Sequence, residues 1–513
     1  MTSVAPRDTV VMVAALAASG VAAVRWLRVA QAEHYAPGSV SRFAARWWWV
    51  WQPPNRVLLA AALAGLLGMA VTPAAGMVTT ATVATGPFGL TLRGRTSKLV
   101  WTRRLRTLAG AWAFIEVLIV AVGLSLGAGP VVAVLAAVAA PVLVDAALVV
   151  TAPLERRLAQ PFVDAAAARL RSIGPTVVAV TGSYGKTTTK VYIAHLLAGT
   201  KTVLATPKSY NNRNGLARTI NERLAPGTEV LVAEMGTYGP GEIAEMCELV
   251  PPDVSAITAI GPVHLERMGS EERITAAKAE ILHHARAVVL NVDEPRLAAL
   301  ADRAGADGRR VVRCSAENVA ADVLVSPQGP LTLVVANGEE VARLPRLDAP
   351  PTNVAIAVAV AFLIGVPADE IATRLADLPV VDNRLSVGNT SSGATVIDDT
   401  FNSNPAGAAA ALEKLRGLAA PEGQRVVITP GMVELGPRQA PENEVLARAA
   451  SSVATTLIVV GRTNRPALVA GGRDGPAAVL CVETRDEAVA WARDHLGAGD
   501  VVLYENDLPD IYA

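Results

Sequence analysis

Long apolar stretches occupy the first third of the chain, and short apolar runs separated by polar segments follow in the rest. The long stretches lie near residues 8–24, 57–91, 107–127 and 130–152. Each is long enough to cross a hydrocarbon core about 30 Å thick as a helix, and the second is long enough to cross it twice. The pattern therefore predicts a transmembrane helical region of four or five helices over residues 1–152.

Positive charges gather in three clusters between and after these stretches. Since basic loops tend to stay on the cytoplasmic side, three cytoplasmic clusters require residues 57–91 to form a hairpin, which gives five crossings with the N-terminus outside. Four crossings would put the first cluster on the opposite side. Both topologies predict a multi-pass protein of the plasma membrane, with the lipid bilayer as a partner and the remaining domains in the cytoplasm. The clusters are Arg25, Arg28, Arg42, Arg46 and Arg56; Arg93, Arg95, Lys98, Arg103, Arg104 and Arg106; and Arg156, Arg157, Arg169 and Arg171.

Two flanking segments suit a membrane surface. Tryptophan favours the headgroup level, so Arg46-Trp47-Trp48-Trp49-Val50-Trp51 is typical of an interfacial anchor, with a platform for a sugar or polyprenyl chain as the alternative. Residues 153–174 are basic and repeat an apolar residue at every fourth position, which predicts an amphipathic connector helix lying at the surface.

Short apolar runs alternate with helix-like segments from Val177 to about Leu378. This alternation predicts a parallel sheet covered by helices, so we place a central α/β domain over residues 175–379. Residues 380–513 predict a second, Rossmann-like α/β domain. Its strand candidates are Val426–Ile428, Leu457–Val460, Val479–Val482 and Val501–Tyr504.

Composition narrows the function classes. The formal net charge is zero, so the chain has no overall basic field to attract nucleic acid, and we expect no nucleic-acid partner. The cysteines Cys247, Cys314 and Cys481 are far apart, which argues against a disulfide framework or a zinc site and suits a reducing compartment.

The strongest local motif runs from Val177 to Lys190, where a buried-strand pattern leads into Thr181-Gly182-Ser183-Tyr184-Gly185-Lys186-Thr187-Thr188. Strand, glycine turn, Lys-Thr and helix in this order are typical of a phosphate-binding loop. The glycines let backbone N–H groups close around phosphate, the lysine supplies a positive charge and the threonine hydroxyl can hold Mg²⁺. The alternative is a glycine turn with a surface lysine. The order therefore predicts a central P-loop domain of the ATPase type.

Further polar residues follow later strands. Glu234 ends the buried run Val230–Ala233, His264 follows a strand at Val254–Ile260, and Lys278 lies on a largely apolar helix. Each alone is more typical of a surface carboxylate, a loop histidine or a lysine that extends to solvent.

Taken in this order, the motifs resemble those of the Mur ligase family, in particular its MurF-type members, over roughly residues 175–505. The matching stretches are Thr181–Lys190, Asn211–Gly215, Ala233–Gly236, Gly261–Glu266, Ala277–Ile281, Asp398–Pro405 and Met432–Gly436.

The resemblance implies an ATP-dependent acid–amino-acid ligase that activates a carboxylate as an acyl phosphate before an amine attacks it. Two Mg²⁺ sites are implied, with Thr187, Glu234, His264 and Lys278 as ligands and Lys278 carbamylated. Lys186, Lys278, His264 and Arg384 would then be catalytic. The implied nucleotide-binding residues are Thr181, Gly182, Ser183, Gly185, Lys186, Thr187, Thr188, Asn353, Arg384 and Asp398.

The chain departs from the family pattern at two places. Asn353 matches the adenine-binding stretch, but Ile356 stands where the family has a second asparagine. The segment Leu503–Asp510 carries acidic residues where MurF-type chains carry basic ones. A membrane region also replaces the soluble domain that normally binds the UDP-sugar. We therefore expect an envelope precursor, with a polyprenyl-linked form as one candidate, and an amino acid or dipeptide as substrates.

Three functions are weighed. The first is a membrane-anchored amide ligase of cell-envelope, peptidoglycan-related assembly. The second is a membrane-tethered ligase that makes a poly-amino-acid capsule. The third is an ATP-binding membrane scaffold or regulator without ligase activity, which the loss at Ile356 and the altered tail would fit. Retention of Lys186, Glu234, His264 and Lys278 argues against the third, because a scaffold needs no second metal site.

Overall fold

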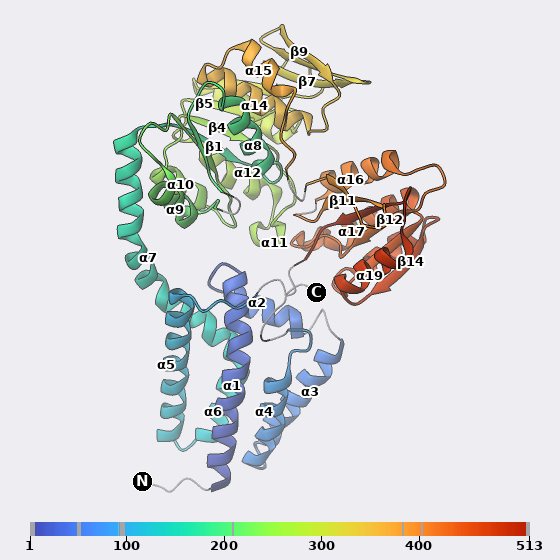
Figure 1. The fold of residues 1–513 in the computed structure, drawn as a ribbon. Coiled ribbons are helices and arrows are strands. Elements are labelled where there is room, and N and C mark those ends of the chain that lie inside the picture. Colours follow the sequence, from blue (N-terminus) through green and yellow to red (C-terminus); the bar gives the residue numbers. More distant parts are fainter. Residues whose placement is uncertain are drawn as a thin grey trace. The chain divides into compact units, whose positions relative to one another are not determined.

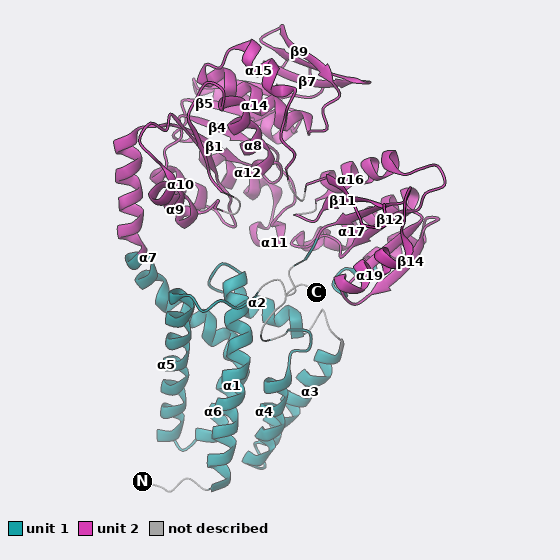
Figure 2. Ribbon diagram, in the orientation of Figure 1, with its two compact units in different colours: residues 1–158, 461–466, 507–513 teal, residues 159–460, 467–506 magenta. Residues whose placement is uncertain are grey.

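The computed structural model describes residues 6–48, 53–90, 92, 98–207, 210–381, 384–401 and 404–508. The chain divides into two compact units (Figure 2). The first contains residues 1–158, 461–466 and 507–513, and the second contains residues 159–460 and 467–506. Each unit is described by itself.

The first unit is built of helices (Figure 1). Two of them, α1 and α5, are long and apolar enough to cross a membrane, and α6 with α7 would form a third span if this bent pair counts as one. The helices are α1 (Pro6–Ala32), α2 (Ser39–Arg46), α3 (Pro53–Gly68), η2 (Pro73–Ala75), α4 (Gly76–Thr85), α5 (Arg103–Ser125), α6 (Gly129–Val138) and α7 (Ala140–Ile173).

The structure corrects the outline of two predicted spans. Within the predicted stretch 57–91, α4 does fold back against α3, and the Thr79 hydroxyl on α4 donates to the Ala62 carbonyl on α3 at 2.8 Å. However, α4 has ten residues, so at 1.5 Å per residue it reaches only about 15 Å. The predicted single span 130–152 is broken by a 78° bend between α6 and α7. The number of crossings therefore stays a prediction.

A buried acidic residue organises the α2 end of this unit. Asp145 on α7 is 7% exposed and accepts hydrogen bonds from the backbone N–H groups of Gly38 at 2.9 Å and Ser41 at 2.8 Å. These donors lie at the N-terminus of α2, where helix N–H groups lack partners within the helix, so the carboxylate serves as a cap from another helix.

The tryptophan-rich segment differs in part from the predicted anchor. Trp47 is fully buried, and its indole N–H donates to the Phe88 carbonyl at 2.8 Å, so it is a core residue of the unit and not a lipid-facing one. Trp49 and Trp51 lie outside the described residues. Residues 153–173 of the predicted connector belong to the second half of α7, which has 34 residues. Figure 2 shows that α7 passes from the first unit into the second.

The second unit contains a nine-stranded sheet in the order β2-β3-β1-β4-β5-β6-β7-β8-β9. Strands β1 to β7 pair in parallel, as the alternation predicts, whereas β8 and β9 extend the sheet antiparallel. The strands are β1 (Thr176–Thr181), β2 (Val203–Ala205), β3 (Val230–Glu234), β4 (Val254–Ile257), β5 (Ala287–Asn291), β6 (Arg310–Ser315), β7 (Val323–Gln328), β8 (Leu331–Ala336) and β9 (Glu339–Pro345).

Helices cover both faces of this sheet because its central strands are buried on both sides. One core contains α9, α10, α12, α13 and the last turns of α7, and the other contains α8, α14 and α15. The bounds are α8 (Lys186–Leu197), α9 (Arg213–Arg223), α10 (Glu242–Leu249), α11 (Leu265–Met268), α12 (Glu271–Ala279), η3 (Glu280–Leu282), α13 (Pro295–Ala306), α14 (Pro351–Ile364) and α15 (Ala368–Leu375).

A second sheet of six strands has the order β10-β11-β15-β12-β13-β14, with β10 antiparallel to the rest. All four predicted strands are present, as β12 to β15. The elements are β10 (Ser386–Asn389), β11 (Thr395–Asp399), α16 (Pro405–Leu418), β12 (Arg425–Thr429), η4 (Gly436–Arg438), α17 (Gln439–Val453), β13 (Thr456–Val460), α18 (Arg465–Arg473), β14 (Ala478–Val482), α19 (Arg485–His495) and β15 (Val501–Glu505).

Candidate active site

The predicted phosphate loop connects β1 to α8. Residues 177–181 of β1 are buried, and Gly185 adopts a left-handed conformation with φ of 75° directly before the first residue of α8. The Lys186 ammonium lies back over the loop, 2.7 Å from the Gly182 carbonyl and 3.4 Å from the Ser183 carbonyl. The first N–H groups of α8 lie beside this lysine, which is the arrangement that binds phosphate at helix N-termini.

Neighbouring segments fix the shape of this loop. The Ser183 hydroxyl donates to the Gly261 carbonyl at 3.1 Å and accepts from the Gly261 N–H at 3.0 Å. Gly182 has a φ of 152°, and a Cβ atom there would collide with the Thr258 hydroxyl. The loop after β4 therefore holds the phosphate loop, and a side chain larger than hydrogen does not fit at Gly182.

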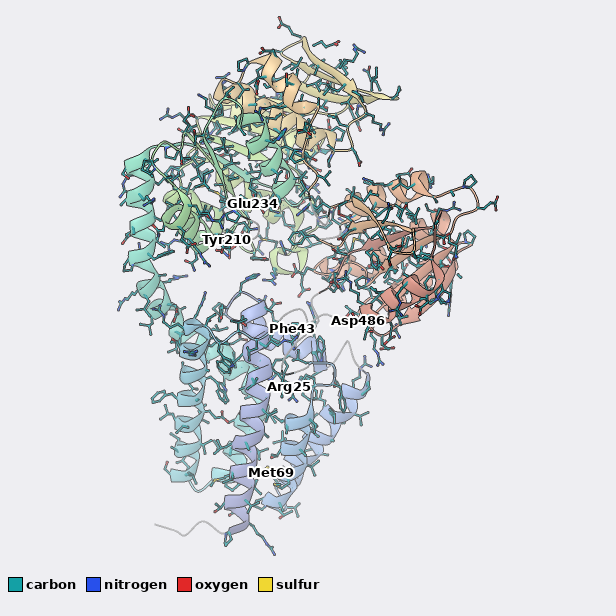
Figure 3. All side chains as sticks on the ribbon, in the orientation of Figure 1. Arg25, Phe43, Met69, Tyr210, Glu234 and Asp486 are labelled. Carbon is teal, nitrogen blue, oxygen red and sulfur yellow. The ribbon has the colours of Figure 1, made fainter. Side chains whose placement is uncertain are left out.

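Glu234, at the end of β3, is the centre of a buried polar cluster. One carboxylate oxygen, Oε2, accepts from the Thr187 hydroxyl at 2.9 Å and from the Lys190 ammonium at 2.9 Å. The other, Oε1, accepts from the Asn211 amide at 3.3 Å. Because β1 and β3 are adjacent parallel strands, their carboxyl ends bring Glu234 to the phosphate loop. Figure 3 labels Glu234 within this domain.

The electrostatics follow from this burial. Burial alone would raise the pKa of Glu234, but the ammonium groups of Lys190 and Lys186 outweigh it, so the pKa lies below its ordinary value. Burial lowers the pKa of Lys186 to about 8, with Glu234 acting in the opposite direction and Arg384 in the same one. Glu234 therefore remains ionised at neutral pH. Lys186, with a pKa of about 8, loses its proton only slightly above neutral pH.

Lys278 lies near the same cluster, and no described residue supplies it with a compensating anion. Its side chain is 4% exposed on α12, and burial holds its pKa well below the ordinary value, with the charge of Lys186 acting in the same direction. Burial of an unpaired ammonium is strongly unfavourable, so the amine is best accommodated as a neutral or chemically modified group.

Arg384 also lies within electrostatic reach of the phosphate loop. Burial lowers its pKa, whereas Glu234 and Asp399 raise it. Its guanidinium stacks over the Phe401 ring, with the central carbon 5.1 Å from the ring centroid. The second α/β domain thus places one cation beside Glu234.

His264 is in a different arrangement. Its Nδ1 pairs with the carboxylate of Glu434, which lies in the loop between β12 and η4, and the Tyr238 ring lies edge-on to the imidazole at a centroid distance of 4.8 Å. Arg267 also reaches Glu434 at 3.4 Å. His264 has a φ of 58° and directly precedes α11. The imidazole is therefore bound by a carboxylate of the neighbouring domain and does not join the cluster around Glu234.

The remaining predicted nucleotide-binding residues are distributed around the loop. The Thr181 hydroxyl donates to the Met235 carbonyl at 2.7 Å, and Thr188 is buried in α8. Asn353 on α14 faces Gly185, where a Cβ atom would lie 2.6 Å from the Asn353 amide oxygen. Asp398 instead accepts from the Thr400 N–H at 3.1 Å and the Thr400 hydroxyl at 2.7 Å. This pattern fits a local turn.

Ile356 explains one departure from the family pattern. It lies one helical turn after Asn353 on α14 and is fully buried in the core shared with α8. The position is therefore apolar and packed, and it offers no contact to a base.

Three partners in this site were assigned no role from the sequence. Lys190 and Asn211 bind Glu234, and Glu434 binds His264. Lys190 had a local signal, because residues three apart on a helix share a face and Thr187 precedes it by three. Asn211 and Glu434 lie in the family-like stretches Asn211–Gly215 and Met432–Gly436, but their contacts join distant segments and no residue spacing predicts the partners.

The residues around Glu234 suit magnesium. A threonine hydroxyl and a carboxylate are the oxygen ligands that Mg²⁺ takes next to phosphate. Among the described residues, no three His, Cys, Asp or Glu side chains gather into a metal-binding group. The described ligands are thus too few for an all-protein cage and fit an ion that a nucleotide helps to hold.

A phosphate loop on a parallel sheet, followed by a separate α/β domain that supplies a cation, defines a nucleotide-dependent enzyme. Residues 180–342 match the Mur ligase middle domain, and residues 383–504 match the glutamate ligase domain of Mur ligases. The chain belongs to the Mur ligase family. It is an ATP-dependent, amide-forming ligase of the MurF-like type, and its function lies in peptidoglycan synthesis.

Curated relatives and solved structures agree with this assignment. UDP-N-acetylmuramoyl-tripeptide–D-alanyl-D-alanine ligase of Mycobacterium tuberculosis is 35% identical over 373 residues, which cover 66% of this chain and 72% of that protein. The enzyme of the same name from Escherichia coli is 30% identical over 310 residues, covering 56% and 67%. MurF of Thermotoga maritima in complex with ADP is 27% identical with a TM-score of 0.59, covering 68% and 80%.

Proposed function

We propose that this protein is a membrane-anchored ligase that joins the carboxylate of a peptidoglycan-type precursor to the amine of an amino acid or a dipeptide. The names of the relatives point to a UDP-N-acetylmuramoyl tripeptide and D-alanyl-D-alanine as the first pair to test. The observation that carries the proposal is the contact between Thr187 and Glu234 beside Lys186, at the carboxyl ends of β1 and β3.

We assign the following roles around ATP, which supplies the phosphoryl group that activates the carboxylate. Lys186 and the N–H groups at the start of α8 bind the terminal phosphates. Thr187 and Glu234 hold a first Mg²⁺, which offsets the repulsion between a carboxylate and a phosphate tail. Thr181, Gly182, Ser183, Gly185 and Thr188 shape the loop.

We assign Lys278 and His264 to a second Mg²⁺ site. Burial lowers the pKa of Lys278 and so favours its neutral amine, which can react with CO₂ to give a carbamate. Carbamylation converts the buried amine of Lys278 into an anion close to the positive charge of Lys186. It therefore relieves the unfavourable burial and creates an oxygen ligand. His264 would join this site once Glu434 releases its imidazole.

We assign Arg384, Asn353 and Asp398 to the nucleotide. Arg384 comes from the second α/β domain and acts electrostatically on Lys186, so it is placed to contact a phosphate bound there. Asn353 lies against Gly185 and is suited to the purine end. Asp398 would act on the ribose only after giving up its bonds to Thr400.

The membrane anchor rests on the first unit. Its helix α5 presents large apolar side chains outward, with Phe114 70%, Val117 63% and Leu118 53% exposed. The soluble surface of a protein rarely carries such a continuous apolar face. We propose that α1, α5 and the α6–α7 pair hold the enzyme in the plasma membrane, with its α/β domains in the cytoplasm. The acceptor is then a precursor presented at the bilayer, for which a polyprenyl-linked form is the candidate.

The test is release of ADP by the full-length protein in detergent, with Glu234→Gln as the inactive control. Three acceptors are compared: the UDP-linked muramoyl tripeptide, a polyprenyl-linked precursor, and no acceptor, each with D-alanyl-D-alanine. We expect acceptor-dependent ADP release and a new amide in the product by mass spectrometry. Absence of any amide with both acceptors, despite nucleotide binding, would favour the scaffold, and repeated addition of one amino acid would favour a poly-amino-acid product.

A further inference from the structure

Lys190 is the residue of this site that the mechanism above leaves unused. It lies four residues after Lys186 on α8, but the two ammonium groups point to different partners. Lys186 contacts loop carbonyls, whereas Lys190 Nζ lies 2.9 Å from Glu234 Oε2. The Lys190 and Glu234 side chains are 3% and 4% exposed, so the pair is shielded from water.

The hydrogen-bond donors around Glu234 occupy the carboxylate oxygens that a metal ion would need. Glu234 Oε2 already accepts from both Thr187 and Lys190, and Oε1 accepts from Asn211. A divalent cation that binds Oε2 must therefore displace Thr187 or Lys190 or share the oxygen with them. Lys190 also neutralises the carboxylate, and Lys186 and Arg384 act on it as further cations. Without phosphate, this region carries an excess of positive charge.

We propose that Lys190 closes the Glu234 site to free divalent cations and thereby couples metal binding to nucleotide binding. The proposal rests on the metal-binding role of Glu234 proposed above. The buried ammonium lies where a cation would bind Glu234 in the nucleotide-free protein, and it keeps the carboxylate ionised and oriented. Nucleotide phosphates reverse the local charge, and the metal then enters as the metal–nucleotide complex. Lys190 is thus a positioning residue, and it contacts no reacting atom.

The sign of the effect follows from Coulomb's law. A unit positive charge removed from a buried position near a divalent cation favours that cation strongly, because the local dielectric constant is low. Lys190→Met keeps the length of the side chain and removes the charge. Free metal should then bind without nucleotide, and the factor by which nucleotide increases metal affinity should fall.

The experiment is a titration of Mn²⁺ followed by electron paramagnetic resonance on the full-length protein in detergent, with and without ADP. We expect Lys190→Met to bind Mn²⁺ at least tenfold more tightly than wild type in the absence of ADP. Lys190→Arg should behave like wild type. Lys201→Met is the matched control, because Lys201 pairs with Glu229 at 3.4 Å on the surface. Addition of Glu234→Gln to Lys190→Met should abolish the gained site.

Unchanged or weaker Mn²⁺ binding by a folded Lys190→Met protein would overturn the proposal. If the unpaired carboxylate destabilises this variant, its urea midpoint is measured with and without Mg²⁺. A larger Mg²⁺-induced increase than in wild type supports the proposal, and an equal or smaller one contradicts it. Failure of the proposed function gives a different pattern, because wild type would then form no amide with either acceptor whatever the Mn²⁺ titrations show, whereas acceptor-dependent ADP release retained by Glu234→Gln would contradict the metal-binding role of Glu234.

Discussion

At the scale of single residues, the site is a dense group of cations around one carboxylate. Lys186, Lys190 and Arg384 act on Glu234, with Lys190–Glu234 as a direct ion pair, and the buried amine of Lys278 lies close enough to Lys186 to feel its charge. Such a group suits a polyanionic ligand, because it gains its compensating charge only when phosphates bind. The protonation of Lys186 and the proposed carbamylation of Lys278 can each be tested by experiment.

Nucleotide affinity should fall as pH rises above about 8. Burial lowers the pKa of Lys186 from 10.5 to about 8, so the nucleotide-free protein loses this proton in that range, whereas bound phosphate favours the protonated form. Binding then requires proton uptake, and the dissociation constant for ADP should rise by up to about tenfold per pH unit. Isothermal titration calorimetry between pH 7 and 10 measures this slope, and buffers of different ionisation enthalpy count the proton.

The lowered pKa of Lys186 also determines how this residue changes the free energy of unfolding with pH. The unfolded chain keeps the Lys186 proton up to about pH 10.5, so between pH 8 and 10.5 the unfolded state binds more protons, and this group makes the free energy of unfolding rise with pH. Lys186→Arg keeps its charge throughout and should remove the pH slope of ADP affinity. A slope that persists unchanged in Lys186→Arg would assign the titration to another group.

Lys278→Ala should abolish ligation and be restored in part by short carboxylic acids. The substitution removes the proposed carbamate, and acetate or formate can place a carboxylate in the space left by the side chain. We expect a loss of at least about 100-fold in ADP release, which corresponds to about 2.7 kcal/mol, and at least a several-fold recovery with acid. The matched control is Lys201→Ala on the surface. Full activity of Lys278→Ala without added acid would refute the carbamate role.

At the scale of elements, the sequence was sufficient for the strands that are apolar throughout. Strands β3 and β4 are buried along their whole length and β1 at every residue after its first, and an apolar run bounded by turn residues predicts such strands directly. The β8–β9 extension was not predicted, because an alternation of strands and helices predicts parallel strands only and β9 has a single buried residue. The bend between α6 and α7 was also missed, since the apolar stretch continues across it.

The candidate site could be predicted in part, because some of its residues directly follow predictable strands and turns. Glu234 follows a buried strand and Lys186 follows a glycine turn, so adjacent parallel strands brought them together as expected. The pairing of His264 with Glu434 joins positions 170 residues apart and depends on how two domains contact each other. Hydrophobic periodicity carries no information about such a contact.

Helix α14 should tolerate no polar residue at Ile356. The side chain is fully buried against α8 and the sheet, so Ile356→Asn removes apolar contacts and buries an amide without partners. We expect a loss of about 3 kcal/mol in the free energy of unfolding and no gain in ADP affinity. Urea denaturation and calorimetry measure the two quantities. Val319→Asn, at a position 84% exposed, is the control. Tighter ADP binding by Ile356→Asn would show that this position reaches the base.

At the scale of the whole molecule, the chain combines a family-typical pair of α/β domains with a helical unit that the family match does not include. The matched residues begin at 180, after α7 has ended at Ile173. The length of the helices limits how this unit crosses a bilayer. Helices α1 and α5 have 27 and 23 residues, whereas α4 has ten. The position of the turn between α3 and α4 therefore decides the topology.

A single cysteine introduced at Pro73, in the short helix η2 between α3 and α4, tests the predicted five crossings. The five-crossing arrangement brings α3 through the bilayer to the outside, so an impermeant maleimide should label Pro73→Cys in intact cells. Cys481 is exposed, and we expect it in the cytoplasm, where the reagent reaches it only after lysis. It therefore serves as an internal control for cell integrity. The 16 residues of α3 span about 24 Å, which is marginal for a core of about 30 Å. Labelling of Pro73→Cys only after lysis would exclude the hairpin and favour four crossings or a re-entrant segment. Labelling of neither cysteine after lysis would mean that the reagent fails to reach them, and a smaller maleimide would then be used.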